Sequence, residues 1–420
     1  MARLAGPEGA GRPPLDRPSA PRNGIARGVR PVLAVVLGLL IQAGCNSGSA
    51  TPAPKKQPGP PAPAAPAPAE PVAAQATYAR LCAPCHADDG TGYRADHAPS
   101  LVNPTFLETA SDEFLRRSII FGRPGSSMAA YGKALGGPLD DAAVNGLVAW
   151  IRDKGPKGLP MRTLPPVPKG VAAKGGELYQ QYCKSCHGDA KTRGEGPHLA
   201  NLQFLGAASD AFIKHAIAQG RPKTRMLAFG TVMTDDQINN VVAYVRGLGA
   251  AATEVALLPE PTGKEPLVLN PKGPPPAWRP REDRYVPVDD VAAALKAGQR
   301  MIIIDARPPS DWRRVHIAGA VSIPYHDLTR LAEVPKDAWV VAYCACPHHL
   351  SGVVADELKK RGHAHPLVLD EGINVWHQRG YPVVAAEGVT PPPKDMMQQG
   401  PVLAPQTPAP LAPAPQKTRP

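Results

Sequence analysis

Two short cysteine and histidine motifs of identical spacing stand in the first half of this chain. The sequence CAPCH occupies residues 82–86, and CKSCH occupies residues 183–187. Two thiols at this spacing can bond to the vinyl groups of a haem, while the adjacent histidine binds its iron. A single copy could instead be a redox disulfide or half of a zinc site. The repeat predicts two covalently bound haem c groups, attached through Cys82, Cys85, Cys183 and Cys186.

A methionine follows each motif inside a loop of matching sequence. The run GRPGSSMAAYG covers residues 122–132, and GRPKTRMLAFG covers residues 220–230. Glycine and proline interrupt regular structure, so that such a loop can aim a side chain inward. The repeat therefore predicts Met128 and Met226 as ligands of the two irons.

The predicted axial pairs are His86 with Met128 and His187 with Met226. His97 and His198 are the rival ligands, and bis-histidine ligation is the alternative, but both follow the haem histidine too closely to reach the opposite haem face easily. With two protein ligands, haem iron passes single electrons and has no open position for a substrate. We therefore expect electron transfer rather than oxygen chemistry.

An amphipathic helix is predicted at the end of each repeat. Apolar residues recur at helical spacing after the acidic starts at residues 139–141 and 234–236. The apolar faces carry Val144, Leu147, Val148 and Ile151 in the first helix, and Ile238, Val241, Val242 and Val245 in the second.

With these elements, residues 73–153 and 171–249 each resemble a class I cytochrome c domain, an all-α fold. The resemblance includes the runs PSL at 99–101 and PHL at 197–199. In that family the proline carbonyl accepts a hydrogen bond from the haem histidine, which implies that Pro99 and Pro197 orient the two histidines.

The first helices of the two repeats differ in their glycine content. That family usually packs a glycine of the first helix against an aromatic residue of the last. Gly175 and Gly176 precede Tyr179 in the second repeat, whereas alanine and glutamine precede Tyr78 in the first. This difference predicts looser helix packing in the first domain.

Alternating strands and helices are predicted in the last third of the chain. Residues 301–305, 338–344 and 367–369 have the pattern of buried strands, and residues 351–361 and 372–379 that of helices. Alternation of this kind is typical of an α/β domain with a parallel sheet.

Residues 283–386 resemble a rhodanese domain. The matching runs are IDAR at 304–307, HIAGA at 316–320, IP at 323–324, YC at 343–344, GINVW at 372–376 and GYP at 380–382. The family carries its nucleophilic cysteine at a strand end, which here implies Cys344. A thiolate there can be stabilised by backbone N–H groups and the following helix, and can accept sulfane sulfur from thiosulfate, a polysulfide or a persulfide.

The loop after Cys344 departs from the rhodanese pattern. The run CACPHHLS at residues 344–351 lacks the arginine that follows the cysteine in that family, which leaves the substrate and the activity open. Related phosphatase and arsenate reductase loops need this arginine, so those activities are not expected. Cys346 could resolve a persulfide or form a disulfide with Cys344, and His348 and His349 could supply positive charge; equally, all three could be structural.

The amino terminus has the pattern of an export signal. Arginines precede an apolar run at residues 31–44 that is too short to span a bilayer. The run QAGC at 42–45 resembles a lipoprotein box, which implies lipid attachment at Cys45; an ordinary signal peptide is the alternative. Both this signal and the haem motifs predict the periplasm of a Gram-negative bacterium, with membrane contact through a lipid anchor only.

Proline-rich segments separate the predicted domains. Nine of the 22 residues at 51–72 are proline, a composition that favours an extended tether. The net charge is +11, of which +4 lies in residues 1–44, and no nucleic-acid site is expected. The predicted order is a signal peptide at 1–44, tether at 45–72, cytochrome c domain 1 at 73–153, linker at 154–170, cytochrome c domain 2 at 171–249, Pro-rich linker at 250–282, rhodanese-like domain at 283–386 and Pro-rich disordered tail at 387–420.

Two classes of function follow from this organisation. In the first, an exported dihaem cytochrome transfers electrons to and from a periplasmic redox partner protein, and its rhodanese-like domain is an inactive binding module or transfers sulfur separately. In the second, the chain is a sulfur-handling enzyme that loads sulfur on Cys344 and passes electrons to its haems. The fusion of the domains favours the second class, and the missing loop arginine favours the first.

Overall fold

The computed structural model describes residues 71–95, 97–251, 255–345 and 349–391. The predicted signal peptide, Cys45, most of the tether, Cys346, His348 and the tail beyond residue 391 lie outside the described residues. Among the described helices, none has both the length and the apolar character needed to cross a membrane. The predicted domain boundaries remain predictions.

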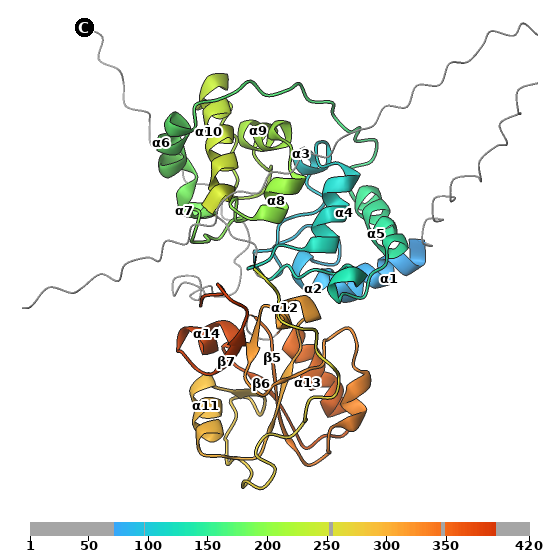
Figure 1. Cartoon of the computed structure of the whole chain (residues 1–420). Helices are drawn as coiled ribbons and strands as arrows, with labels where there is room; N and C mark the ends of the chain where they lie inside the picture. The colour runs from blue at the N-terminus through green and yellow to red at the C-terminus, as the bar shows by residue number, and fades with distance from the viewer. Residues whose placement is uncertain (1–70, 96, 252–254, 346–348, 392–420) are drawn as a thin grey trace, which may run out of the picture. The chain divides into compact units, whose positions relative to one another are not determined.

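The first repeat is helical (Figure 1). Ser111 caps α4 by accepting a hydrogen bond from the Phe114 amide, and Asp140 caps α5 in the same way through the Ala143 amide. The predicted apolar face of α5 is buried. The helices are α1 (Pro71–Leu81), α2 (Ala83–His86), α3 (Pro104–Leu107), α4 (Asp112–Phe121) and α5 (Asp141–Lys154), with a short 3-10 turn η1 (Lys133–Leu135) before α5.

The second repeat has the same order of helices. Ser209 caps α9, and Thr234 and Gln237 form a reciprocal capping box at the start of α10, where the sequence predicts a helix start. The helices are α6 (Ala172–Tyr182), α7 (Lys184–His187), α8 (Leu202–Ala207), α9 (Asp210–Gln219) and α10 (Asp235–Leu248), followed by the 3-10 turn η2 (Gly249–Ala251).

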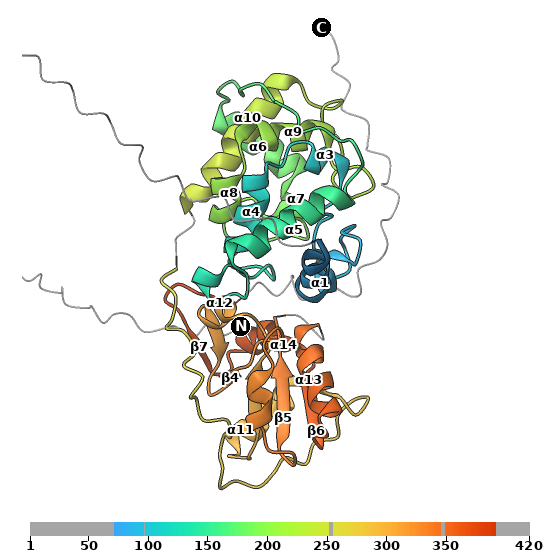
Figure 2. The same cartoon turned by 90° about the vertical axis from the view of Figure 1, so that its right-hand side faces the viewer.

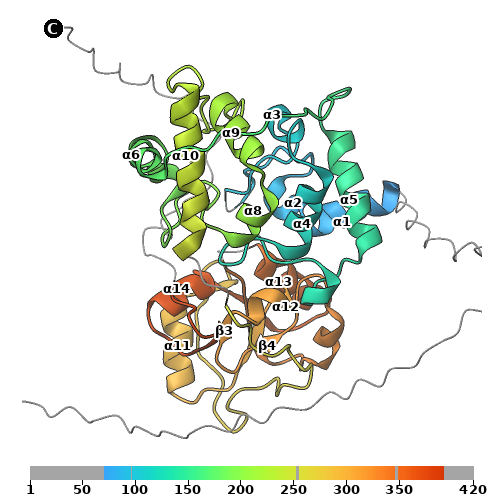
Figure 3. The same ribbon diagram turned by 45° about the horizontal axis from the view of Figure 1, so that its top comes forward.

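The first and last helices of each repeat pack together, but not in the same way (Figure 3). In the second repeat α6 approaches the backbone of α10 so closely that a Cβ atom at Gly175 would lie 1.9 Å from the Asn240 carbonyl oxygen. In the first repeat Ala74 stands at this position, and the Tyr78 and Trp150 rings stack with centroids 3.8 Å apart, compared with 5.0 Å for Tyr179 and Tyr244 in the second repeat. The glycine difference in the sequence therefore corresponds to a difference in backbone approach.

The carboxyl-terminal region is an α/β domain built on a parallel sheet. Its strand order is β1-β6-β5-β2-β4, and β3 and β7 form a separate antiparallel pair. The strands are β1 (Tyr285–Val286), β2 (Ile302–Asp305), β3 (Val315–Ile317), β4 (Val321–Ser322), β5 (Trp339–Tyr343), β6 (His365–Leu369) and β7 (Val383–Ala385). The helices are α11 (Val288–Lys296), α12 (Pro309–Trp312), α13 (Leu350–Lys360) and α14 (Gly372–Gln378), with the 3-10 turn η3 (Thr329–Glu333).

Both faces of this sheet are covered, which explains why its strands read as continuous apolar runs. Ile302 and Ile304 belong to the core that includes Val354 of α13, whereas Ile303 belongs to the core that includes Trp376 of α14. Figure 2 shows α13 beside β5 and β6. Helix α13 begins at Leu350, one residue before the predicted start, and β6 begins two residues before the predicted strand.

Candidate functional site

The two motif histidines have the same local geometry. His86 Nδ1 donates to the Pro99 carbonyl oxygen at 2.9 Å, and His187 Nδ1 donates to the Pro197 carbonyl oxygen at 2.8 Å. Burial lowers the pKa of both histidines, while the hydrogen bonds oppose this shift. A neutral imidazole with its proton on Nδ1 carries a lone pair on Nε2, the form that binds iron. The arrangement fits a haem ligand in both repeats.

The motif cysteines are held in one helical turn. The His86 amide donates to the Cys82 carbonyl oxygen, and the His187 amide donates to the Cys183 carbonyl oxygen, both at 2.9 Å. Burial raises the pKa of Cys82 to about 12 and that of Cys183 to about 11. Both side chains therefore lie in an apolar setting, which suits the walls of a haem crevice. The described residues contain no cluster of three or more His, Cys, Asp or Glu that could hold a metal ion.

The two methionine loops are closed by equivalent hydrogen bonds. The Arg123 amide donates to the Met128 carbonyl oxygen at 2.7 Å, and the Arg221 amide donates to the Met226 carbonyl oxygen at 2.8 Å. Gly122 starts the first loop at φ +60°, where a Cβ atom would lie 2.4 Å from the backbone of Ala129. Only glycine accepts that conformation without strain. Both methionines are partly buried against the helical core.

The rival histidines differ in their surroundings. His198 Nε2 donates to the Asp189 carbonyl oxygen at 2.8 Å, so its own loop occupies that ring nitrogen. His97 lies in a left-handed backbone conformation with φ +51°, and its buried Nε2 has no hydrogen-bond partner among the described residues. The contacts of His198 disfavour it as an iron ligand, whereas methionine ligation matches the repeated loops.

Cys344 lies directly after β5, at the carboxyl edge of the parallel sheet, and only 1% of it is exposed. Its Sγ lies 3.3 Å from Oγ of Ser351, a buried residue in the first turn of α13. Its carbonyl oxygen accepts from the Ile373 amide at 3.0 Å, and a Cβ atom at Gly372 would lie 2.7 Å from the same oxygen. The cysteine is thus packed between the starts of α13 and α14. Ser351 was not among the predicted site residues, because a serine at a helix start has many ordinary roles.

A buried ion pair lies on the neighbouring strand. Arg307 donates to both carboxylate oxygens of Asp305, at 2.9 and 2.6 Å, and Tyr343 Oη donates to the same carboxylate at 2.8 Å. Burial alone would lower the pKa of Arg307, but Asp305 raises it above the ordinary value. Arg307 is therefore committed to Asp305 and does not replace the missing loop arginine.

The carboxyl edge of the sheet also carries a contact with the first helical repeat. The parallel register sets Asp305 beside Tyr343 and Ser322, so the residues after β4 lie on the same edge as Cys344. Tyr325 follows β4, and its hydroxyl donates to the carbonyl oxygen of Leu81, the residue before Cys82, at 3.2 Å.

Tyr131, three residues after Met128, completes this contact. Its hydroxyl lies 3.1 Å from that of Tyr325 and also donates to the Leu81 carbonyl oxygen. Burial, followed by the neighbouring Tyr325, raises the pKa of Tyr131 well above its ordinary value, so that it remains a neutral hydroxyl group. The sheet edge that bears Cys344 therefore touches the segment before the first haem motif and the segment after Met128. No signal in the sequence pointed to Tyr325.

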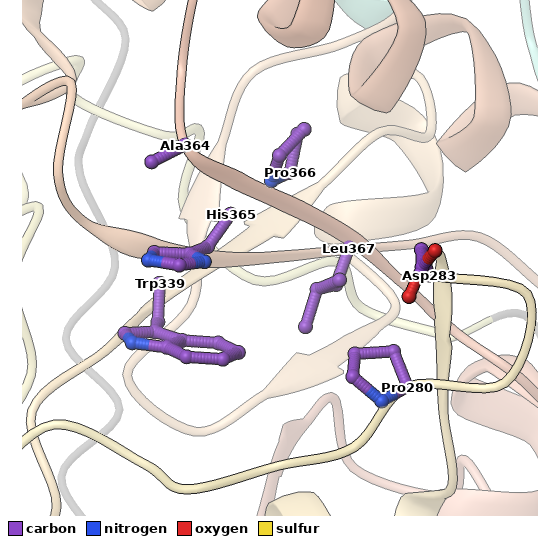
Figure 4. Close-up of a pocket in the computed structure, with 7 residues that line it drawn as sticks. All are labelled: Pro280, Asp283, Trp339, Ala364, His365, Pro366 and Leu367. Atoms are coloured by element: carbon purple, nitrogen blue, oxygen red, sulfur yellow. The ribbon is translucent and has the colours of Figure 1, made fainter.

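A pocket lies at the other end of the strands (Figure 4). Trp339 and His365, the first residues of β5 and β6, stack there with ring centroids 4.0 Å apart. Because the two strands are parallel, this pocket is at the amino edge, away from Cys344. It takes no part in the chemistry considered for the cysteine.

Comparisons with known proteins agree with this division of the chain. The family "Cytochrome C oxidase, cbb3-type, subunit III" matches residues 69–151 and 170–245, and the family "Rhodanese-like domain" matches residues 287–379. The chain is 30% identical over 179 residues to the cbb3-type cytochrome c oxidase subunit FixP of Bradyrhizobium diazoefficiens, covering 40% of this chain and 57% of FixP. It therefore spans little more than half of that relative.

The carboxyl-terminal domain has relatives of its own. It is 31% identical over 101 residues to a sulfurtransferase of Allochromatium vinosum, covering 24% of this chain and 94% of that protein. Among solved structures, a rhodanese-related protein of Thermoplasma volcanium shares 25% identity, with a TM-score of 0.21 and coverage of 24% of this chain and 97% of the other.

Proposed function

We propose that this chain, whose two helical domains belong to the family of cbb3-type cytochrome c oxidase subunit III and whose third domain is rhodanese-like, is an exported dihaem cytochrome. We also propose that it handles sulfane sulfur at Cys344. The cytochrome domains imply covalently bound haem c, and we propose two such groups. The proposed attachment sites are the four motif cysteines, and the proposed axial pairs are His86 with Met128 and His187 with Met226. Bound haem supplies one-electron acceptance and donation, and a periplasmic protein is the proposed redox partner.

One observation favours a link between the sulfur site and the haem site. The hydroxyl of Tyr325, on the same sheet edge as Cys344, donates to the carbonyl oxygen of Leu81 next to the first haem motif. An unconnected binding module would not need its reactive edge against a cytochrome domain. We therefore propose the first cytochrome domain as the entry point for electrons that come from sulfur chemistry.

The same contact supports a second candidate function, oxidation of a sulfur compound. In the simplest balanced step, the Cys344 thiolate and a hydrosulfide ion form one S–S bond and yield a persulfide, one proton and two electrons. Two haems match the two electrons. Thiosulfate and polysulfides are alternative sulfur donors for transfer to Cys344 without net oxidation. The missing loop arginine favours the opposite view, an inactive rhodanese-like module.

Haem absorbance distinguishes these functions. Addition of sulfide, thiosulfate or a polysulfide to the oxidised protein should reduce the haems if the two sites are coupled, and Cys344→Ser should abolish this reduction. Cys346→Ser is the matched control for the loop and should retain it unless Cys346 resolves the persulfide. If dithionite reduces both haems but no sulfur compound does, direct coupling is refuted. Thiocyanate formation from cyanide then tests sulfur transfer alone.

We also propose that a signal peptide at residues 1–44 exports the chain to the periplasm, and that Cys45 carries a lipid anchor. The apolar run and the QAGC sequence support this proposal. Incorporation of radiolabelled palmitate should occur in the unmodified protein and be lost in Cys45→Ala. Full labelling of the variant would contradict attachment at this residue.

A further inference from the structure

The two cytochrome domains contact each other through a cluster of phenylalanine rings. The contact is reciprocal, because equivalent residues of the two domains take part in it. The rings of Phe114 and Phe212 lie 4.8 Å apart between centroids, with Phe106 beside Phe212 and Phe204 beside Phe114. Phe106 and Phe114 in the first domain stand 98 positions before Phe204 and Phe212 in the second. Helix α3 therefore contacts α9, and the equivalent helix α8 contacts α4.

The methionine loops take part in this contact. Arg123 lies in the loop of Met128, and its guanidinium stands over Phe114 and over Phe204 of the other domain. Arg221 lies in the loop of Met226 and stands in the same way over Phe212 and Phe106. Burial lowers the pKa of both arginines to about 10, although both remain charged at neutral pH.

Hydrogen bonds from each domain reach the methionine loop of the other. Asn201 Nδ2 donates to the Pro124 carbonyl oxygen at 3.0 Å, and Asn103 Nδ2 donates to the Pro222 carbonyl oxygen at 2.9 Å. The two asparagines occupy the same position, directly before α8 and α3. Thr105 Oγ1 adds a bond to the Gly220 carbonyl oxygen at 2.8 Å.

These bonds act on the turn that carries each methionine. Pro124 stands four residues before Met128, in a turn closed by the bond from the Arg123 amide to the Met128 carbonyl oxygen. A hydrogen bond to the Pro124 carbonyl therefore restrains the same closed turn. Loss of such a bond favours an open loop, in which the methionine leaves the iron and an external ligand can take its place.

We propose that each cytochrome domain holds the methionine loop of the other, with Asn201 as the positioning residue for Met128 and Asn103 as the positioning residue for Met226. This inference rests on the proposed function in one respect, the binding of both methionines to haem iron. Its consequence is that the ligation of each haem depends on a residue of the other domain. A domain on its own would have a looser sixth ligand.

The substitutions Asn201→Asp and Asn103→Asp test this dependence. Aspartate keeps the oxygen that accepts from the Phe204 amide in the first case and the oxygen that lies 3.0 Å from Thr105 Oγ1 in the second. It replaces the N–H group that donates to the opposite loop with a carboxylate oxygen, which cannot donate and carries negative charge. Thr105→Val removes the bond from Oγ1 to the Gly220 carbonyl oxygen and serves as a second variant if Asn103→Asp does not fold.

Imidazole titration of the ferric full-length protein measures how often each loop is open. In a Met226→His background, only the first haem keeps the methionine-to-iron charge-transfer band, and imidazole abolishes this band when it displaces Met128. Because the apparent affinity follows the fraction of open loops, loss of one hydrogen bond should tighten imidazole binding roughly fivefold. Asn201→Asp should show this effect, and Asn103→Asp should not.

In a Met128→His background the result should be reversed, with Asn103→Asp and Thr105→Val tightening imidazole binding at the second haem. Equal effects of both asparagine variants at one haem, or no effect of either, would overturn the inference while leaving methionine ligation intact. Absence of the charge-transfer band from the unmodified protein would instead overturn the proposed methionine ligation, and the inference with it.

Discussion

At the scale of single residues, burial decides which groups can carry charge. His86 and His187 are held neutral with Nδ1 as the donor, which leaves Nε2 to bind a metal. Arg307 keeps its charge because Asp305 accompanies it into the core. A side chain that is buried without an oppositely charged partner loses its charge more easily, as His326 does.

His326 should make the stability of the protein depend on pH. Burial, together with the nearby positive charge of Arg80, lowers the pKa of His326 to about 4 from 6.5, and its Nε2 has no hydrogen-bond partner among the described residues. The unfolded chain therefore binds a proton more readily than the folded chain between these values. The free energy of unfolding should fall as the pH is lowered from 6.5 to 4, by at most about 3 kcal/mol from this residue.

Urea unfolding at pH 6.5 and pH 4.5 measures this contribution. His326→Gln removes the titrating group, so the variant should lose less stability on acidification than the unmodified protein. Above pH 7 the free energies of unfolding of the two proteins should change with pH in the same way and differ only by a constant amount. An equal loss of stability in the two proteins would show that His326 does not titrate in this window.

At the scale of elements, the close approach of α6 to α10 depends on a missing side chain. A Cβ atom at Gly175 meets the carbonyl of Asn240, which belongs to the backbone of α10 and cannot rotate away. In the first domain Ala74 stands at the corresponding position, and the Tyr78 and Trp150 rings stack where the Tyr179 and Tyr244 rings pack in the second domain. The same fold therefore reaches a stable packing by two routes.

Gly175→Ala should destabilise the second cytochrome domain by about 1–3 kcal/mol, the usual cost of overpacking a contact. Gly247→Ala is a matched control in α10, because a Cβ atom there meets no atom within 4 Å. The control should raise stability by about 0.5–1 kcal/mol through helix propensity. Helical circular dichroism during urea unfolding compares the two, and equal stabilities would refute this account of the packing.

At the scale of the whole chain, the described contacts join three sequence-distant sites. Asn103 and Asn201 each connect one cytochrome domain to the methionine loop of the other, and Tyr325 connects the rhodanese-like domain to the segment before Cys82. The order of contacts is thus rhodanese-like domain, first cytochrome domain, second cytochrome domain. Such an order suits a chain in which electrons enter at a sulfur site and pass through two haems in turn.

Much of the local structure could be predicted because its signals lie within a few residues of one another. The helix starts at α5 and α10 follow from acidic and capping residues next to an apolar face, and the strands β2 and β5 follow from continuous apolar runs. The haem motifs, the matched loops of Met128 and Met226, and the placement of Cys344 at a strand end belong to the same class. The ligand and nucleophile assignments themselves stay predictions until they are measured.

The sequence by itself determined the domain types, since a Cys-x-x-Cys-His motif or a strand pattern keeps its meaning wherever the chain folds. Only the tertiary structure decided which of these pieces touch. Asn103 and Pro222 are 119 residues apart, and Tyr325 and Leu81 are 244 apart. Contacts at such separations depend on the complementary shapes and polar groups of finished surfaces, which leave no periodic pattern in the sequence. The proline-rich connectors did not predict these contacts. Their composition indicates separate domains, and it does not show which surfaces of those domains pack together.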